Sequence, residues 1–285
     1  MSLLAFGQTG QVAQELARLG VVTLGRREAE LTDPQACADI IARTNATAVI
    51  NAAAYTAVDR AEEEEALAHQ INAAAPAAMA RACADKGLPF VHISTDYVFD
   101  GSGTAPRLPI DPTNPLGAYG RTKLAGEDSI RRSGARHAIL RTSWVFSAHG
   151  ANFVKTMLRL GGDHAQLNIV GDQIGGPTPA AAIAQACVTI AKTLTHDVDK
   201  SGTYHFSGAP DLSWADFART IFDAAGLDVA VNEIPTAEYP TPATRPLNSR
   251  LECSATQSAF GIERPDWQAG LRDVLVHLKG SDSGA

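Results

Sequence analysis

Short apolar runs alternate with longer amphipathic segments over the first 145 residues of the chain. The short runs predict five strands, at residues 2–6, 21–24, 47–51, 89–93 and 137–142. Strands that alternate with helices are typical of βαβ units. We therefore expect an α/β fold, in which a doubly wound parallel sheet carries helices on both faces.

Two of the segments between these strands have a clear helical pattern. Val12 and Leu16 recur at helical spacing ahead of Gly20, which we expect to end that helix. An Ala-rich run from about 61 to 86 predicts a long helix that is kinked at Pro76. Four glutamates at its start, residues 62–65, complement the positive end of the helix dipole. We interpret them as a solvated face rather than as a metal or partner site.

The alternation loosens beyond residue 145, where glycine and proline turns separate shorter helices, expected near 152–160, 178–194 and 213–225. This pattern predicts a smaller substrate domain interleaved with the first domain. We expect the first domain to consist of 1–145, rejoined by about 178–206 and 230–250. We expect the second to consist of about 146–177, 207–229 and 251–279. Residues 280–285 are expected to form a disordered tail.

The composition excludes several classes of function. The chain has 285 residues, of which 45% are hydrophobic, and a net charge of −7. No apolar run approaches the roughly 18 residues that cross a bilayer, and the acidic balance argues against nucleic acid as a partner. The four cysteines lack metal-binding spacing, and the chain opens on a strand-like run instead of a signal peptide. We expect a cytoplasmic protein that binds neither nucleic acid nor a membrane.

The first strand runs directly into a loop that contains glycines, and a helix begins inside that loop. Glycines let a backbone approach a pyrophosphate, and a helix N-terminus offers free N–H groups. Ala13 stands where a third glycine is common, a position at which a methyl group can be accommodated. The strand, loop and helix predict a Rossmann-type dinucleotide site, formed by Gly7, Thr9, Gly10, Gln11 and Val12.

The end of the second strand bears on the choice of cofactor. An acidic residue there would bind the ribose of NAD, but this chain has Gly25-Arg26-Arg27. Two arginines favour a cofactor with a 2′-phosphate, so we predict NADPH, with NADH as the alternative. Arg26 or Arg27 is the predicted contact with that phosphate. The other interpretation, two solvated surface arginines, stays open.

Polar side chains follow the fourth strand, at Ser94, Thr95, Asp96 and Tyr97. Open α/β sheets bind ligands at the carboxyl ends of their strands, where a hydroxyl group can reach a substrate carbonyl. This end of the sheet is therefore the predicted catalytic site.

A helix downstream carries Tyr119 and Lys123, and we expect it to begin with Asn114 as N-cap and Pro115 in the first helical position. A spacing of four residues puts both side chains on one face. The ammonium of Lys123 would lower the pKa of Tyr119, so that the phenol could exchange a proton near neutral pH.

Together these segments resemble the extended short-chain dehydrogenase/reductase family, over nearly the whole chain. The resemblance is carried by residues 7–12, 51–59, 94–100, 119–127, 141–145 and 172–178. The last two segments resemble one group of reductases within that family. The resemblance implies an NAD(P)H-dependent oxidoreductase that reduces the 4-keto group of a small-molecule substrate, a dTDP-sugar.

The resemblance also implies roles for individual residues. Tyr119 would give a proton to the ketone oxygen, Lys123 would hold the nicotinamide ribose, and Thr95 would hydrogen-bond the ketone, with Asp96 beside it. Further cofactor contacts would come from Ala52, Ala53, Ala54 and Tyr55. Substrate contacts would come from Val58, Thr95, Tyr97, Trp144, Asn152, Gln173 and Arg245. A core position beneath a domain interface is the alternative for Trp144.

Metal binding and alternative functions remain open in the sequence. Some members of the group of reductases that this chain resembles are dimers linked by magnesium. Glu15 matches one of their ligand positions, but the other acidic ligands have no clear equivalent in this sequence. Mg²⁺ is therefore unassigned, and a homodimer is an open alternative. The eight histidines form no ligand motif. A different nucleotide-4-ketosugar reductase or epimerase is one alternative function. A non-catalytic regulatory subunit, of the kind that binds methionine adenosyltransferase, is the other.

Overall fold

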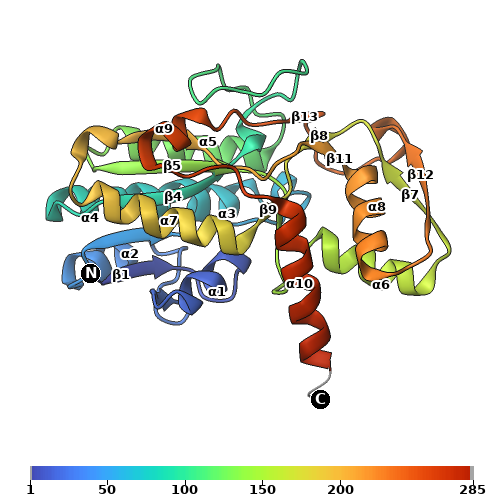
Figure 1. The fold of residues 1–285 in the computed structure, drawn as a ribbon. Helices are drawn as coiled ribbons and strands as arrows, with labels where there is room; N and C mark the ends of the chain where they lie inside the picture. The colour runs from blue at the N-terminus through green and yellow to red at the C-terminus, as the bar shows by residue number, and fades with distance from the viewer. Residues whose placement is uncertain (1, 283–285) are drawn as a thin grey trace.

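Six parallel strands form the main sheet of the protein, which the computed structural model describes over residues 2–282 (Figure 1). The strands are β1 (Leu3–Phe6), β2 (Val22–Leu24), β3 (Ala48–Asn51), β4 (Phe90–Thr95), β5 (His137–Thr142) and β10 (Gly202–His205). Their order across the sheet is β10-β5-β4-β3-β1-β2. All five expected strands are present, and β10 adds a sixth beside β5. The doubly wound Rossmann-type fold is therefore confirmed.

Helices cover both faces of this sheet. One face packs against α1 (Gln11–Arg18) and α7 (Ala180–Leu194), the other against α2 (Pro34–Arg43), α4 (Ala75–Lys86) and α5 (Ala118–Arg131). In β1, Leu3 and Ala5 join one core, whereas Leu4 and Phe6 join the other. Because successive side chains of a strand point to opposite faces, a strand covered on both sides is apolar throughout.

The Ala-rich segment before β4 is not the single kinked helix that the sequence predicts. It consists of η1 (Arg60–Glu62), α3 (Glu65–His69), a wide π-type turn η2 (Gln70–Ala74) and α4. Pro76 has no N–H to donate to the preceding turn, and its ring crowds the carbonyl of Asn72, four residues earlier. A wider turn relieves this crowding. It also brings Asn72 Nδ2 to 3.1 Å from Thr122 Oγ1 on α5.

Two of the glutamates at 62–65, Glu62 and Glu65, contact α5, so the interpretation of this run as a solvated face is wrong for these two residues. Glu62 Oε1 accepts the Ala118 N–H at 2.8 Å. Glu65 accepts two hydrogen bonds from the Arg121 guanidinium, at 2.9 and 2.8 Å. The acidic residues therefore hold the first turn of α5 against the preceding segment.

The same contact explains where α5 begins. The sequence predicts a start at Pro115 capped by Asn114, but the first helical residue is Ala118, and its N-cap, Gly117, offers no side-chain acceptor. The Glu62 carboxylate takes that place, and a negative charge at a helix N-terminus is favourable. A cap from a distant segment leaves no local trace in the sequence.

A smaller unit lies beside the main sheet (Figure 1). It contains α6 (Phe153–Asp163), α8 (Trp214–Ala225), α10 (Trp267–Asp282) and the parallel strands β7 (Gln166–Val170) and β12 (Ala230–Ile234). In its core, Phe217 makes edge-on ring contacts with Phe146 and Trp267. The three helices expected after residue 145 are confirmed as α6, α7 and α8, with small shifts at their ends.

Several segments lie differently from the expected division into domains. The sequence pattern assigns 230–234 to the larger domain, but β12 pairs with β7 of the smaller unit. It assigns 254–260 to the smaller domain, but α9 (Ser254–Phe260) packs against α7 and β10. Residues 280–282, expected in the tail, belong to α10, and 283–285 lie outside the described residues. For both β12 and α9, the elements that they contact are distant in the chain, so the local sequence pattern could not assign them.

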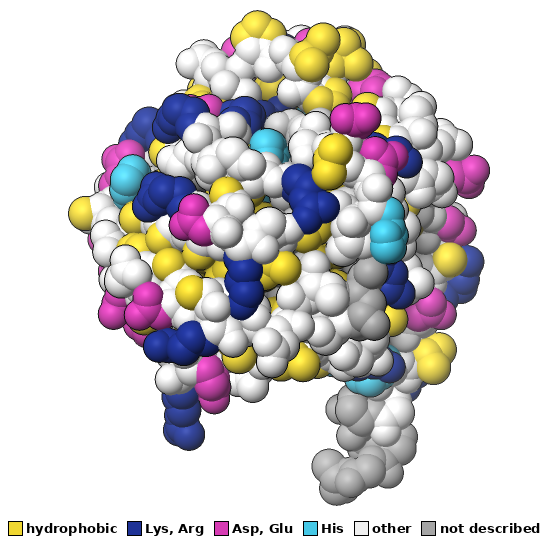
Figure 2. Space-filling model, turned by 90° about the vertical axis from the view of Figure 1, so that its left-hand side faces the viewer, with side chains coloured by type: hydrophobic (Ala, Val, Ile, Leu, Met, Phe, Trp, Pro, Cys, Tyr) yellow, Lys and Arg dark blue, Asp and Glu magenta, His cyan; other side chains and the backbone are white. Residues whose placement is uncertain are grey.

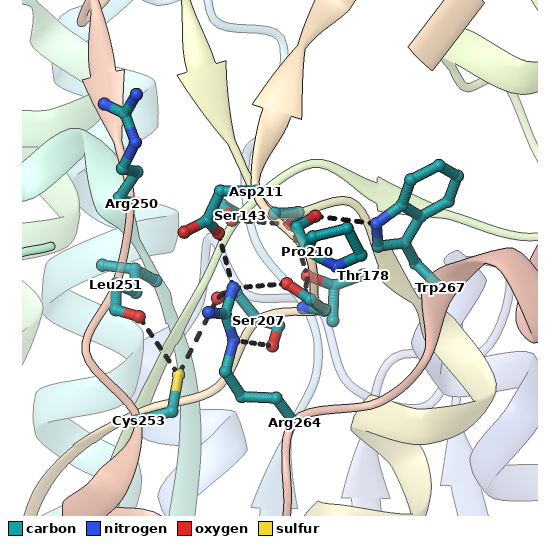
Figure 3. Close-up of polar contacts among 12 residues, drawn as sticks. Ser143, Thr178, Ser207, Pro210, Asp211, Arg250, Leu251, Cys253, Arg264 and Trp267 are labelled. Atoms are coloured by element: carbon teal, nitrogen blue, oxygen red, sulfur yellow. Dashed lines mark hydrogen bonds and ion pairs between the residues drawn. The ribbon is translucent and has the colours of Figure 1, made fainter. Parts of the chain in front are cut away.

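Short strands and a polar network join the two units. The strands are β6 (Val145–Phe146), β8 (Ile174–Gly175), β9 (Thr178–Pro179), β11 (Leu212–Ser213) and β13 (Asn248–Ser249). At the centre of the network, the Arg264 guanidinium donates to Ser207 O at 3.1 Å and pairs with Asp211 (Figure 3). Trp267 Nε1 donates to Pro210 O at 2.8 Å. These contacts fix the crossing between β10 and α8.

The loop from residue 99 to 117 rises above the sheet (Figure 1). It carries exposed apolar side chains. Ile110 is 89% exposed and Leu108 42%. Figure 2 shows apolar side chains gathered at this end of the molecule, with acidic and basic side chains interspersed below them. Within residues 2–282, no helix is both long enough and apolar enough to cross a membrane.

Candidate functional site

The turn between β1 and α1 fits the pyrophosphate of a dinucleotide. Gly7 has a φ of 114°, and a Cβ placed on it would lie 3.3 Å from the carbonyl carbon of Ala52. Gly10 is the N-cap of α1 and has open space where a side chain would be. Because no side chain caps α1, its first N–H groups are available to an anion. Val12 is buried in the core, so any contact from it would come from its backbone.

Arg26 and Arg27 lie at the same edge of the sheet as this turn. The Gly7 N–H donates to Leu24 O at 2.9 Å, which holds the end of β2 against the glycine turn. Both arginines follow directly and are exposed; the closest acidic atom to Arg26 is Glu30 Oε2, at 3.6 Å. An arginine at this place can reach a 2′-phosphate on the adenosine ribose.

The residues from Ala52 to Tyr55 leave β3 beside the glycine turn. The Ala52 N–H donates to Phe6 O at 2.9 Å. Further on, Asn72 Oδ1 accepts the Tyr55 N–H at 2.8 Å, and Asn72 Nδ2 donates to Tyr55 O at 3.1 Å. Alanines at 52–54 keep this segment free of bulk next to Gly7. The segment is therefore fixed in position and borders the turn, as its predicted cofactor role requires.

Thr95, Asp96 and Tyr97 end β4, and α5 brings Tyr119 against them. The rings of Tyr97 and Tyr119 make an edge-to-face contact, with their centroids 5.6 Å apart. Thr95 Oγ1 lies 3.1 Å from Asp96 Oδ1 and also interacts with the Tyr119 hydroxyl. Gly120 permits this approach, because a Cβ there would lie 2.2 Å from Tyr97 O. The predicted catalytic groups are thus in one place.

Burial shifts the acid–base behaviour of this group. Desolvation raises the pKa of Tyr119 to about 12; the hydrogen bond with Thr95 opposes the rise and the charge of Asp96 adds to it. Desolvation also raises the pKa of Asp96 to about 6, against hydrogen bonds from Ser249 and Thr95. The expected lowering of the Tyr119 pKa by Lys123 is therefore wrong for this structure. The phenol keeps its proton at neutral pH, which is the state that a proton donor needs.

Lys123 lies one turn further along α5 than Tyr119. Its Nζ is 2.7 Å from Ile93 O and 3.1 Å from His92 Nε2, so the amine is anchored to β4. The residue is only 1% exposed. Desolvation lowers the pKa of Lys123 to about 8, although the charge of Glu127 opposes the change.

An ion pair connects the loop after β3 to the chain before β13. The two guanidinium nitrogens of Arg245 donate to the two carboxylate oxygens of Asp59, at 2.9 and 2.7 Å. Burial and the charge of Asp96 raise the pKa of Tyr97, and the positive charge of Arg245 opposes that rise. Arg245 therefore lies close to Tyr97, and Val58, next to Asp59 in the chain, is brought to the same side of the site.

Trp144 belongs to a second group of predicted substrate residues. It stacks on Trp214 of α8, with ring centroids 3.5 Å apart and planes 11° apart. Trp214 Nε1 donates to Gln173 Oε1 at 3.2 Å. Trp144 has a φ of 49°, a left-handed conformation that is uncommon for a bulky residue and that concentrates at functional sites. A Cβ on Gly175 would lie 2.9 Å from Trp144 Cε2 and 3.0 Å from Ser249 Cβ. Because Ser249 hydrogen-bonds Asp96, the Trp144 group adjoins the group around Tyr119.

Asn152 and Gln11 link the glycine turn to the smaller unit. Asn152 Oδ1 caps α6 by accepting the Lys155 N–H at 3.1 Å, and its Nδ2 donates to Gln11 Oε1 at 2.9 Å. Glu15, also on α1, lies 3.0 Å from His149 Nε2. Within the described part of the chain, no three His, Cys, Asp or Glu side chains are grouped as metal ligands, and we assign no magnesium site to Glu15.

Sequence reasoning missed the buried contacts of His92 and Asn51. His92 Nδ1 lies 3.1 Å from Asn51 Nδ2, and His92 Nε2 contacts Lys123. A signal was present, because His92 interrupts the apolar strand β4. A polar side chain inside a strand covered on both faces requires a buried partner.

A dinucleotide-type turn and a tyrosine and lysine one helical turn apart meet at the carboxyl end of one parallel sheet. This arrangement defines the class as an extended short-chain dehydrogenase/reductase. Residues 1–279 match the family model described as the RmlD substrate binding domain. The chain belongs to the dTDP-4-dehydrorhamnose reductase family, as its relatives show.

Full-length relatives carry that name. The dTDP-4-dehydrorhamnose reductase of Sinorhizobium fredii is 42% identical over 296 residues, covering 99% of this chain and 100% of its own. The Escherichia coli reductase is 40% identical over 294 residues, 98% of each chain. Among solved structures, the Clostridium acetobutylicum reductase has a TM-score of 0.90 and 35% identity, covering 98% of this chain and all of its own. The Bacillus anthracis reductase, solved with NADP, has a TM-score of 0.89 and 32% identity, covering 97% and 100%.

Proposed function

We propose that the protein reduces dTDP-4-dehydro-6-deoxy-L-mannose to dTDP-L-rhamnose, with NADPH as the reductant. The reaction transfers a hydride to carbon 4 of the sugar and a proton to its ketone oxygen, and NADPH becomes NADP⁺. The cofactor supplies the hydride, and the protein must orient the two reactants and deliver the proton. Membership in a family of reductases with this name supports the substrate.

One observation carries the proposal: Tyr119, Thr95 and Asp96 meet at the end of β4. A phenol whose pKa is raised to about 12 holds its proton until an oxyanion forms beside it. Tyr119 is then the proton donor, and the Thr95 hydroxyl holds the ketone oxygen. Lys123 would bind the nicotinamide ribose from the same face of α5.

The remaining predicted residues divide between the two ligands. The backbone at Gly7 to Val12, the segment from Ala52 to Tyr55 and the arginines after β2 would hold the cofactor. The sugar nucleotide would be held by Val58, Tyr97, Trp144, Gln173 and Arg245. Asn152 would act indirectly, by fixing Gln11 and the start of α6.

The preference for NADPH is tested at the arginines. Replacing both, as Arg26→Ala/Arg27→Ala, is expected to lower kcat/KM with NADPH by about tenfold or more, since each lost charge contact with a phosphate costs on the order of 1–3 kcal/mol. With NADH, which lacks the 2′-phosphate, kcat/KM should hardly change. Arg81→Ala, an exposed arginine on α4, is the control. Equal losses with both cofactors would contradict the assignment.

We also propose that the enzyme works in the cytoplasm. All four cysteines are free and buried, and unpaired cysteines are typical of proteins of a reducing compartment. Burial raises the pKa of Cys187 to about 12, so this thiol is unreactive.

The function is tested by mixing purified protein, NADPH and the 4-keto dTDP-sugar generated in situ. Oxidation of NADPH with formation of dTDP-L-rhamnose, identified by chromatography against a standard, is the expected result. Oxidation with another product would identify a different ketosugar reductase, and isomerisation of the sugar with NADPH unchanged would identify an epimerase. Binding without turnover would favour a regulatory subunit.

A further inference from the structure

Three polar side chains form a buried chain of contacts beneath the catalytic residues. Asn51 at the end of β3 contacts His92 in β4, and His92 contacts Lys123 on α5. Asn51 and Lys123 are each 1% exposed, and His92 is 0% exposed. Polar groups this deeply buried must form their hydrogen bonds with one another, because water does not reach them. The direction of each hydrogen bond can therefore be worked out.

The amide of Asn51 fixes the first direction. Its Oδ1 lies 3.1 Å from the backbone N–H of Ala53, a group that can only donate, so Oδ1 is the acceptor there. The amide nitrogen Nδ2 is then the atom that faces His92 Nδ1, at 3.1 Å. An amide NH₂ can only donate, so His92 Nδ1 must present its lone pair. A neutral imidazole with a bare Nδ1 carries its proton on Nε2.

The second direction follows at Lys123. The N–H on His92 Nε2 points to Lys123 Nζ, 3.1 Å away. An ammonium group has three donors and no lone pair, so a protonated Lys123 would set two donors against each other. A neutral amine resolves the conflict, because its lone pair accepts from His92 while one of its own N–H bonds donates to Ile93 O at 2.7 Å.

Burial and the charged groups around Lys123 act in opposite directions on its pKa. On α5, the Glu127 carboxylate pairs with Arg141 at 2.7 Å and with Arg131 at 2.5 Å, which leaves it committed elsewhere. From β4, His92 is the titratable group in contact; burial keeps its pKa well below its usual range, so the imidazole is neutral, and the charge of a protonated Lys123 lowers that pKa further. Burial lowers the pKa of Lys123 itself to about 8, with Glu127 opposing.

We propose that His92 and Asn51 are positioning residues whose hydrogen bonds favour the neutral amine of Lys123, so that in the protein without bound cofactor this lysine loses its proton at a lower pH than an exposed lysine does. Above the pH at which it titrates, Lys123 must take up one proton before it can act as a cation beside Tyr119. The inference rests on the proposed function only in giving Lys123 a place in the catalytic site. The protonation state itself is a property of the free protein.

The test is an NMR titration of the lysine side chains in the free protein, with the Lys123 signal assigned by its loss in Lys123→Met. Lys123 is expected to titrate near pH 8, while an exposed lysine such as Lys192 titrates near the ordinary value of about 10.4. Titration of Lys123 at or above the value of the exposed lysine would overturn the proposal. Neither NADPH nor sugar is present, so absence of reductase activity would not affect this result.

Variants of His92 separate positioning from burial alone. In His92→Gln, the side-chain oxygen can turn toward Lys123 and accept from an ammonium, so the lysine pKa should rise by about one unit or more. His92→Asn can keep the contact with Asn51 but is too short to reach Nζ, and gives no such acceptor. His164→Gln, at the exposed C-cap of α6, is the control. A Lys123 titration that is the same in wild type and His92→Gln would show that burial alone sets the protonation state.

Discussion

Replacing Tyr119 by Phe is expected to lower kcat by about 10²–10⁴-fold, the usual contribution of a positioned acid, and to leave NADPH affinity nearly unchanged. Phenylalanine retains the ring, so the edge contact with Tyr97 survives. What disappears is the hydroxyl that interacts with Thr95, and with it the only proton that this side chain can give. The loss therefore concerns the chemical step rather than binding.

Steady-state kinetics and a fluorescence titration with NADPH measure these two quantities. Tyr204→Phe is the matched control, because it also removes one phenol hydroxyl, which is half-buried and bonded to Lys200 O at 2.8 Å at the edge of the sheet. That variant should keep a normal kcat. A Tyr119→Phe variant with a nearly normal rate would show that another group donates the proton.

Replacing Arg141 by Leu is expected to destabilise the fold by about 3–5 kcal/mol, which is the usual cost of removing one partner of a buried ion pair. Arg141 is 1% exposed and Glu127 is fully buried. The guanidinium makes two hydrogen bonds to the Glu127 carboxylate, at 2.9 and 2.7 Å, and lies over the ring of Phe99. It also donates to Pro109 O at 3.2 Å, which ties down the loop between β4 and α5.

Urea denaturation measures this change in the free energy of unfolding. Arg121→Leu is the control, since it breaks an exposed pair with Glu65 and should cost no more than about 1 kcal/mol. The double variant Arg141→Leu/Glu127→Leu should recover part of the loss, because it also removes the buried carboxylate, which the single variant leaves with only the partly exposed Arg131 as its charge partner. A single variant as stable as the control would show that the buried pair contributes little to the fold.

Patterns along the chain predicted the main sheet and most helices because those elements are determined locally. Strands such as β1 are apolar on both faces, and α6, α7 and α8 show helical periodicity between strong turn signals. The elements that were missed or misplaced depend on distant partners. β12 pairs with β7 across some sixty residues of chain, and α5 begins where Glu62 reaches it.

The candidate site follows the same rule. Thr95, Tyr119 and Lys123 were predicted from motifs whose spacing carries the chemistry, and the structure brings them together. The direction of the Tyr119 pKa shift could not be predicted from the spacing to Lys123, because burial dominates it and burial depends on the packing of α5 against Tyr97. The contacts of Asn51 and His92 depend on the order of the strands in the sheet.

The central claim, that this site carries hydride to carbon 4 of the sugar and a separate proton to its oxygen, is tested most directly by isotope transfer. The protein is incubated with the 4-keto dTDP-sugar and NADPH deuterated at C4 of the nicotinamide ring, and the product is analysed by NMR and mass spectrometry. The expected result is dTDP-L-rhamnose with deuterium at carbon 4 of the sugar, and none at that carbon when ordinary NADPH is used in D₂O. Deuterium at carbon 4 from the solvent, or a product without the cofactor's deuterium, would contradict it.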